Sequence, residues 1–130
     1  MGNSGFEAGD VVFGLWPGRE QGLPKVLRHF SVVLAVLDGG LLLGYTTSLK
    51  VESSSSVNFT DDEREAAGFP KPCRFDPTSV ALVPFDVVKV VGRLPRGCFS
   101  RVRDAHTRAM NSRNVSVGAL TEDREVVFKN

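Results

Sequence analysis

A polar, basic stretch that leads into an apolar run is the first place in the chain where side chains could do chemistry. Its charged and amide side chains are Arg19, Glu20, Gln21, Lys25 and Arg28. Polar groups on a loop that a stiff strand supports are a common arrangement for a binding or catalytic site. Arg28 lies two positions before the apolar run Phe30–Leu37, so that strand should hold its guanidinium in place. An ordinary exposed loop has the same composition.

A hydroxyl cluster follows the next apolar segment, where Thr46, Thr47 and Ser48 leave the expected sheet. Between the two segments, Asp38-Gly39-Gly40 predicts a tight hairpin turn, because Asp-Gly readily supplies the positive φ angles that such a turn needs. Arg28 lies eleven positions before Gly39 and Thr47 lies eight positions after it. We therefore expect both side chains at the same open end of the hairpin. The alternative interpretation is that Thr46 and Thr47 are ordinary strand residues, since threonine is common in β-strands.

The second chemically suggestive region is the arginine-rich segment Gly97–Arg113, whose spacing of apolar residues predicts a helix. The arginines of this region are Arg93, Arg96, Arg101, Arg103, Arg108 and Arg113, against the single acid Asp104. Arginines neutralise phosphates, and that effect dominates non-specific affinity for nucleic acid. A solvated helix face with several arginines would give the same pattern.

Metal and thiol chemistry have little support in the sequence. The acids Asp61-Asp62-Glu63 fit a helix N-terminus, which the helix dipole favours, better than a cation site. His29 and His106 are far apart, and Cys73 and Cys98 are 25 positions apart without metal-ligand spacing. We expect two reduced thiols, no cofactor and no metal. No secretory signal or membrane-spanning segment is visible, which predicts a cytoplasmic protein without a membrane partner.

The chain has 130 residues and a mass of 14.1 kDa, which predicts one domain. Its content of 42% hydrophobic and 24% charged residues is typical of a globular protein. The formal net charge of +1 excludes a strongly basic protein that coats nucleic acid, and the hydrophobic content excludes a disordered chain. The net charge is close to zero because two segments of opposite charge offset each other. Residues 52–65 have a balance of −4 and residues 93–113 a balance of +5.

The elements expected from the sequence are mostly strands. We expect strands at Asp10–Trp16, Phe30–Leu37, Leu41–Thr47, Thr78–Pro84, Asp86–Val91 and Glu125–Phe128, a loop over residues 17–24, a flexible lead over 1–9 and a serine-rich loop over 51–60. Thr60 with Glu63 forms a capping-box pattern, which predicts a short helix, about Asp61–Ala67, ending at Gly68. Paired strands with segregated helices predict a mainly β, α+β fold, a small antiparallel barrel with a short helix and a longer C-terminal helix.

The order of several short motifs resembles the PemK/MazF-like toxin family. These motifs are Gly9-Asp10-Val11-Val12, then Pro17-Gly18-Arg19-Glu20-Gln21-Gly22, then Arg28 before an apolar strand, then Thr47-Ser48 after the next one. The resemblance covers about the first 50 residues. It implies an SH3-like barrel, usually a homodimer, that cuts single-stranded RNA without a metal through attack by the ribose 2′-OH, and that an antitoxin protein neutralises.

Carried over by position, the resemblance makes Arg28 and Thr47 the catalytic residues, which would stabilise the charge that builds on the phosphate. Glu20, His29 and Ser48 could assist, and the RNA-binding residues would be Arg19, Lys25, Lys50, Arg101 and Arg108. The chain departs from the family where Arg-Pro is replaced by Arg28-His29, and its insert Lys50–Pro72 is long. The alternative is therefore an inactive toxin relative, a non-catalytic SH3-like barrel that binds a protein or nucleic acid.

Overall fold

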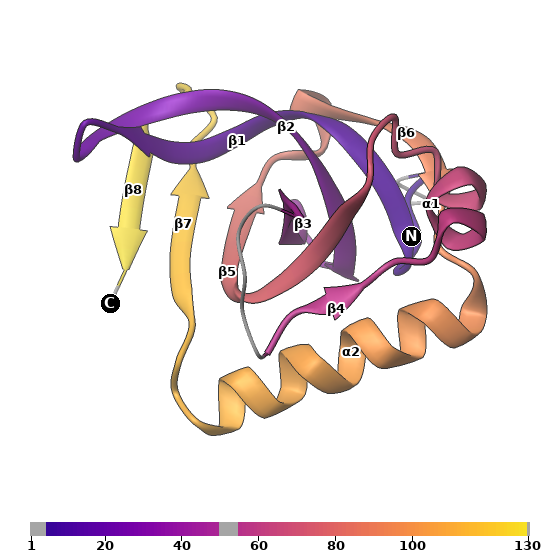
Figure 1. Cartoon of the computed structure of the whole chain (residues 1–130). Coiled ribbons are helices and arrows are strands. Elements are labelled where there is room, and N and C mark those ends of the chain that lie inside the picture. Colours follow the sequence, from indigo (N-terminus) through magenta and orange to yellow (C-terminus); the bar gives the residue numbers. More distant parts are fainter. Residues whose placement is uncertain (1–4, 50–54, 130) are drawn as a thin grey trace.

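The computed structural model describes residues 5–49 and 55–129, and most of them lie in β-strands (Figure 1). The strands are β1 (Asp10–Glu20), β2 (Leu23–Val36), β3 (Leu41–Ser48), β4 (Val57–Asn58), β5 (Cys73–Val83), β6 (Val88–Arg93), β7 (Ser116–Leu120) and β8 (Val126–Lys129). The helices are α1 (Asp61–Ala67) and α2 (Arg96–Asn111), with a short 3-10 helix at Phe85–Val87. Part of the expected lead, residues 1–4, and part of the expected serine-rich loop, residues 51–54, lie outside the described residues, and the prediction of a loop is wrong at Val57–Asn58, which form β4.

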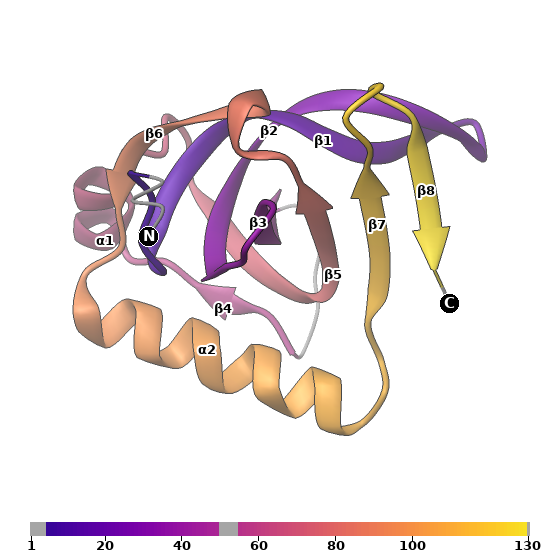
Figure 2. The ribbon, with the colours of Figure 1, turned by 180° about the vertical axis from the view of Figure 1, so that it is seen from behind.

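One sheet forms the body of the molecule, and it curls into a half-barrel (Figures 1 and 2). The strand order is β6-β1-β2-β3-β5-β7-β8, and the short β4 pairs with β5. Every pairing is antiparallel except β5 with β7, so the expectation of an antiparallel sheet is wrong for that pair. Helix α2 crosses from β6 to β7 along one side of the sheet, and this helical connection is what allows a parallel pair. The fold is thus mainly β with two helices, as predicted.

Both faces of the central strands are buried, and adjacent residues belong to different cores. Val11 and Val32 pack with α2 and with Phe75, while their neighbours Val12 and Val33 pack inside the curl. Side chains alternate between the two faces of a strand, so a strand buried on both faces is a continuous apolar run. This explains why the central part of β2 shows no alternation of polar and apolar residues.

The first hairpin corrects the sequence analysis, because residues 17–24 are not a loop. β1 pairs with β2 up to Glu20 and Leu23, and only Gln21 and Gly22 form the turn, with φ angles of 52° and 80°. Positive φ at both central residues matches the two-residue turns whose twist fits a β-hairpin. The result is a long arm that reaches over β7 and β8 (Figure 1).

The second hairpin and the first helix follow the predicted signals. The backbone N–H of Leu37 donates to the Gly40 carbonyl at 2.8 Å, which closes the turn between β2 and β3 at the predicted place, but without the positive φ angles that were expected there. The hydroxyl of Thr60 accepts from the Glu63 backbone N–H, and the Glu63 carboxylate accepts from the Thr60 backbone N–H. Gly68 ends α1 with a φ of 83°, a conformation that glycine adopts without steric cost.

The C-terminal third differs in detail from the prediction. β5 begins at Cys73, five residues before the expected start, and β7 (Ser116–Leu120) had not been expected. Helix α2 is confirmed; its buried residues are Cys98, Val102, Ala105 and Ala109, whereas the apolar side chain of Met110 is 50% exposed. No helix among the described residues is long and apolar enough to cross a membrane.

Candidate functional site

A cavity of about 260 Å³ lies at the open end of the β2–β3 hairpin. Its lining residues are His29, Phe30, Thr46, Thr47, Ser48, Phe69, Pro70, Lys71, Pro72 and Cys73. Three of the predicted site residues, His29, Thr47 and Ser48, therefore meet at one cavity. Aromatic and proline side chains form much of the wall, and an imidazole, hydroxyls and one ammonium supply the polar groups. We call it the hairpin-end cavity.

The wall formed by residues 69–73 was missed by sequence reasoning. Gly68 turns the chain out of α1, and Phe69 is buried against the ring of Phe59, with centroids 5.2 Å apart. Cys73 then opens β5 opposite Ser48 of β3. The only sequence signal was the cluster of prolines after the end of the helix, which marks an irregular connection and not a binding wall.

His29 is fixed by a hydrogen bond across the hairpin. Its Nε2 atom lies 2.6 Å from the carbonyl oxygen of Thr46. A carbonyl oxygen can only accept, so Nε2 carries the proton and Nδ1 of the neutral ring is left with a lone pair. Burial lowers the pKa of His29 below its usual 6.5, and the bond to the Thr46 carbonyl opposes this only in part. At neutral pH the ring is therefore a neutral imidazole that can accept a proton at Nδ1.

Aromatic rings hold the imidazole from one side. The ring of Tyr45 stacks on that of His29, with centroids 4.4 Å apart and an interplanar angle of 8°. Trp16 packs against Tyr45 at 5.1 Å. Burial, and then the negative charge of Asp76, raise the pKa of Tyr45, so its phenol remains protonated at neutral pH. The stack restricts His29 to a single orientation.

Thr46 and Thr47 have different environments. Thr46 is buried, and its hydroxyl donates to the Phe30 carbonyl at 2.8 Å, so it has a structural role. Thr47 is partly exposed, pairs with Arg74 in β5, and has no side-chain hydrogen bond within the described part of the chain. Thr47 lines the hairpin-end cavity together with His29. The catalytic role of Thr47 stays a prediction.

Arg28 lies at the same end of the hairpin but does not line the cavity. It is exposed in β2, opposite Leu15 of β1. Phe30, two positions later, packs toward the α2 side of the sheet, while Tyr45, two positions before Thr47, packs inside the curl. By alternation, Arg28 and Thr47 project from opposite faces of the sheet. The two predicted catalytic residues share a strand end but not a face.

The predicted residues of the first hairpin lie elsewhere. Glu20 pairs with Leu23, six strand positions from His29, which at about 3.3 Å per residue is roughly 20 Å away. Its carboxylate instead forms an exposed ion pair with Lys25, with an Nζ–Oε2 distance of 2.6 Å. The guanidinium of Arg19 lies 3.8 Å from the ring centroid of Phe128 in β8. These three side chains belong to the arm, not to the hairpin-end cavity.

The predicted helix residues also fall outside the cavity. Arg101 forms two hydrogen bonds with the Glu63 carboxylate, at 2.8 and 2.9 Å, so its charge is already compensated. Arg108 lines a separate polar cavity with Ser56 and Thr78. Lys50 lies outside the described residues. The hydrogen bond from Arg101 also lowers the pKa of Glu63.

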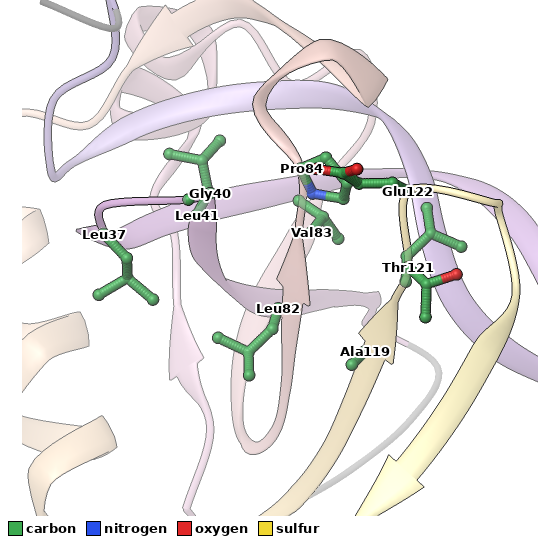
Figure 3. Close-up of a pocket in the computed structure, with 11 residues that line it drawn as sticks. Leu37, Gly40, Leu41, Leu82, Val83, Pro84, Ala119, Thr121 and Glu122 are labelled. Carbon is green, nitrogen blue, oxygen red and sulfur yellow. The ribbon is translucent and has the colours of Figure 1, made fainter. Parts of the chain in front are cut away.

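A second cavity, of about 330 Å³, lies at the turn end of the same hairpin (Figure 3). Leu37, Leu82 and Ala119 line it, and its polar side chains are Thr121 and Glu122. Its apolar lining lacks the imidazole and the ammonium group found at the hairpin-end cavity, so it carries no comparable chemistry.

In the described part of the chain, neither the two thiols nor a group of metal ligands forms a reactive centre. Burial raises the pKa of both Cys73 and Cys98 to about 11, so both thiols are protonated at neutral pH. Within residues 5–49 and 55–129, no three His, Cys, Asp or Glu side chains are grouped so that they could hold a metal ion.

Comparisons with known proteins give no family for the chain. No protein-family model matches it, and no curated protein matches it in sequence.

Proposed function

We propose that this protein binds single-stranded RNA at the hairpin-end cavity and cleaves it without a metal, by attack of a ribose 2′-OH on the adjacent phosphate. The observation that supports the proposal is the meeting of His29, Thr47 and Ser48 at one cavity with an apolar wall. The apolar wall suits an unstacked base, since single-stranded RNA is commonly recognised through splayed bases.

The proposed step moves two protons and exchanges one bond from oxygen to phosphorus for another. Nδ1 of neutral His29 accepts the proton of the 2′-OH as the 2′ oxygen bonds to phosphorus, and the bond to the 5′ oxygen breaks. The leaving 5′ oxygen takes a proton from water, which gives a 2′,3′-cyclic phosphate and a 5′-OH. The hydroxyl of Thr47 donates to a phosphate oxygen where negative charge builds. Arg28, at the same strand end, attracts the backbone phosphate of the bound strand.

The role as a toxin rests on the resemblance of residues 9–48 alone. With it come the further proposals of a neutralising antitoxin and of a homodimer. Growth arrest on expression, relieved by Arg28→Ala or Thr47→Ala, would support that role.

A second candidate is a non-catalytic domain that binds RNA at the same cavity. One observation favours it: Arg28, the expected source of positive charge, does not line the cavity. An enzyme of this kind would normally bring its positive charge to the reacting phosphate.

One assay separates the two candidates. Purified protein is incubated with single-stranded RNA in a chelator of divalent metals, and the products are analysed for 2′,3′-cyclic phosphate ends. We expect cleavage that Thr47→Val and Arg28→Ala reduce and that Lys89→Ala, a change of an exposed lysine in β6, leaves intact. Binding without cleavage would favour the second candidate, and absence of binding would rule out both.

A further inference from the structure

A cavity of about 470 Å³ lies between the N-terminal segment, the end of β6 and the start of α2. Its lining residues are Ala8, Gly9, Arg93, Leu94, Arg96, Phe99, Ser100 and Arg103. It shares no residue with the hairpin-end cavity. Three of the lining side chains are guanidinium groups and none is acidic, so we call it the arginine cavity.

Arg93 is the fixed member of the three arginines. Its Nη1 atom donates to the Glu7 carboxylate and to Oδ1 of Asp10, the latter at 3.0 Å. Asp10 is buried and also accepts from the Glu7 backbone N–H at 2.8 Å. These carboxylates compensate the charge of Arg93, while its remaining N–H groups stay available on a well-positioned guanidinium.

Arg96 and Arg103 are the uncompensated members. Neither forms an ion pair with any carboxylate in the described part of the chain. Arg103 lies over the ring of Phe99 at 5.5 Å, and that ring packs against Gly9, where an added Cβ would come within 3.3 Å of it. Because Gly9 has no side chain, the Phe99 ring can pack against it beneath the guanidinium of Arg103. Two unpaired guanidinium groups face one cavity at the end of the molecule where α2 begins.

We propose that the arginine cavity binds a phosphate group, and a phosphomonoester in preference to a phosphodiester. Guanidinium groups match phosphate oxygens in geometry and form charge-assisted, often bidentate hydrogen bonds with them. A phosphomonoester carries a charge of about −1.5 to −2 at pH 7, which two uncompensated arginines balance. The Ser100 hydroxyl adds a donor at the same wall. The ligand is a free phosphate ion or the terminal phosphate of a nucleic acid.

The test uses inorganic phosphate and short 2′-O-methyl RNA with either a 5′ phosphate or a 5′ hydroxyl, at low salt. These oligonucleotides lack the attacking hydroxyl, so binding is measured without any cleavage. The Arg96→Gln/Arg103→Gln variant is compared with Lys89→Gln/Arg113→Gln, which removes the same charge outside the cavity. Circular dichroism checks that both variants are folded.

We expect phosphate to bind to the wild type and the control, and the Arg96→Gln/Arg103→Gln variant to lose at least about tenfold in affinity. Tighter binding of the 5′-phosphorylated oligonucleotide, with competition by phosphate, would assign the site to nucleic-acid ends. Equal binding of both oligonucleotides with phosphate still bound would assign it to free phosphate. Failure of phosphate to bind, or equal losses in both double variants, would overturn the proposal. None of these outcomes depends on cleavage at the hairpin-end cavity, because the oligonucleotides lack the attacking hydroxyl.

Discussion

The side chain of His29 bonds to the backbone of Thr46, and the side chain of Thr46 bonds to the backbone of Phe30. The first contact joins Nε2 and the carbonyl oxygen at 2.6 Å, and the second joins the hydroxyl and the carbonyl oxygen at 2.8 Å. The backbone pairing of β2 with β3 reaches only as far as Ser31 and Tyr45. Two side-chain bonds therefore hold the hairpin together beyond its last backbone pair, at the cavity where the proposed chemistry takes place.

The bond from Thr46 predicts a contrast between the two threonines. Thr46→Val keeps the shape but removes a buried donor, and should lower the free energy of unfolding by about 1–2 kcal/mol. Thr47→Val removes a hydroxyl without a structural partner and should change it by less than about 0.5 kcal/mol. Urea unfolding of both variants measures the difference, and equal losses would contradict the structural role of the Thr46 hydroxyl.

The Thr47 hydroxyl is predicted to contribute to the rate of RNA cleavage and not to stability. Removing one donor to a developing phosphate charge costs on the order of 100-fold in rate, so Thr47→Val should reduce RNA cleavage by about that factor. Thr107→Val, a matched change at an exposed position of α2, should leave the rate unchanged. Rates are measured with a fluorescent single-stranded RNA, and full activity of Thr47→Val would remove this residue from the mechanism.

His29 predicts a dependence of stability on pH. Its folded pKa lies below the unfolded value of 6.5, chiefly because burial disfavours the imidazolium, and burial shifts His106 in the same direction. The unfolded chain thus binds more protons just below pH 6.5, so stability falls as the pH decreases from 7.5 to 5.5. His29→Asn/His106→Asn should flatten this slope in thermal unfolding. An unchanged slope would show that these rings do not cause it.

The hydrogen-bonded pair of Glu63 and Arg101 predicts a loss of stability at acidic pH. Its hydrogen bonds to Arg101 lower its folded pKa below 4.5, so the stability that this pair contributes is present above pH 4.5 and is lost as the pH falls through the folded pKa. Arg101→Gln should reduce the difference in stability between pH 6 and pH 3. Arg113→Gln, which breaks no ion pair of the described residues, serves as the control, and an identical acid profile for the two variants would refute the assignment.

The turn of the first hairpin can be tested with two glycines. An added Cβ would meet no atom within 4 Å at either Gly22 or Gly39, but only Gly22 has a positive φ, of 80°. Gly22→Ala should therefore lower the free energy of unfolding by about 1 kcal/mol through backbone strain, whereas Gly39→Ala should be neutral or slightly stabilising. Thermal unfolding of both variants decides this, and tolerance of alanine at Gly22 would argue against the tight turn.

Features that depend on neighbouring residues could be predicted from the amino-acid sequence. Asp38-Gly39-Gly40 predicted the second hairpin, and the turn forms there, although none of its residues has the positive φ on which that prediction was based. The capping box from Thr60 to Glu63 and the stop at Gly68 predicted α1, since each signal lies within one helical turn. The sequence also predicted that Arg28 and Thr47 lie at the same open end of the hairpin, because the position of the turn determines which parts of the two strands lie side by side.

Only the tertiary structure decided how those residues meet. Arg28 and Thr47 would share a face if the pairing of Val36 with Leu41 continued in register, but a register shift between Val33 and Ala35 puts them on opposite faces. The wall at residues 69–73 and the arginine cavity join segments far apart in the chain. Arg101 was predicted to bind RNA, but its charge is compensated by Glu63, which lies 38 positions away in the sequence. Such pairings depend on the packing of helices against the sheet, which local signals do not specify.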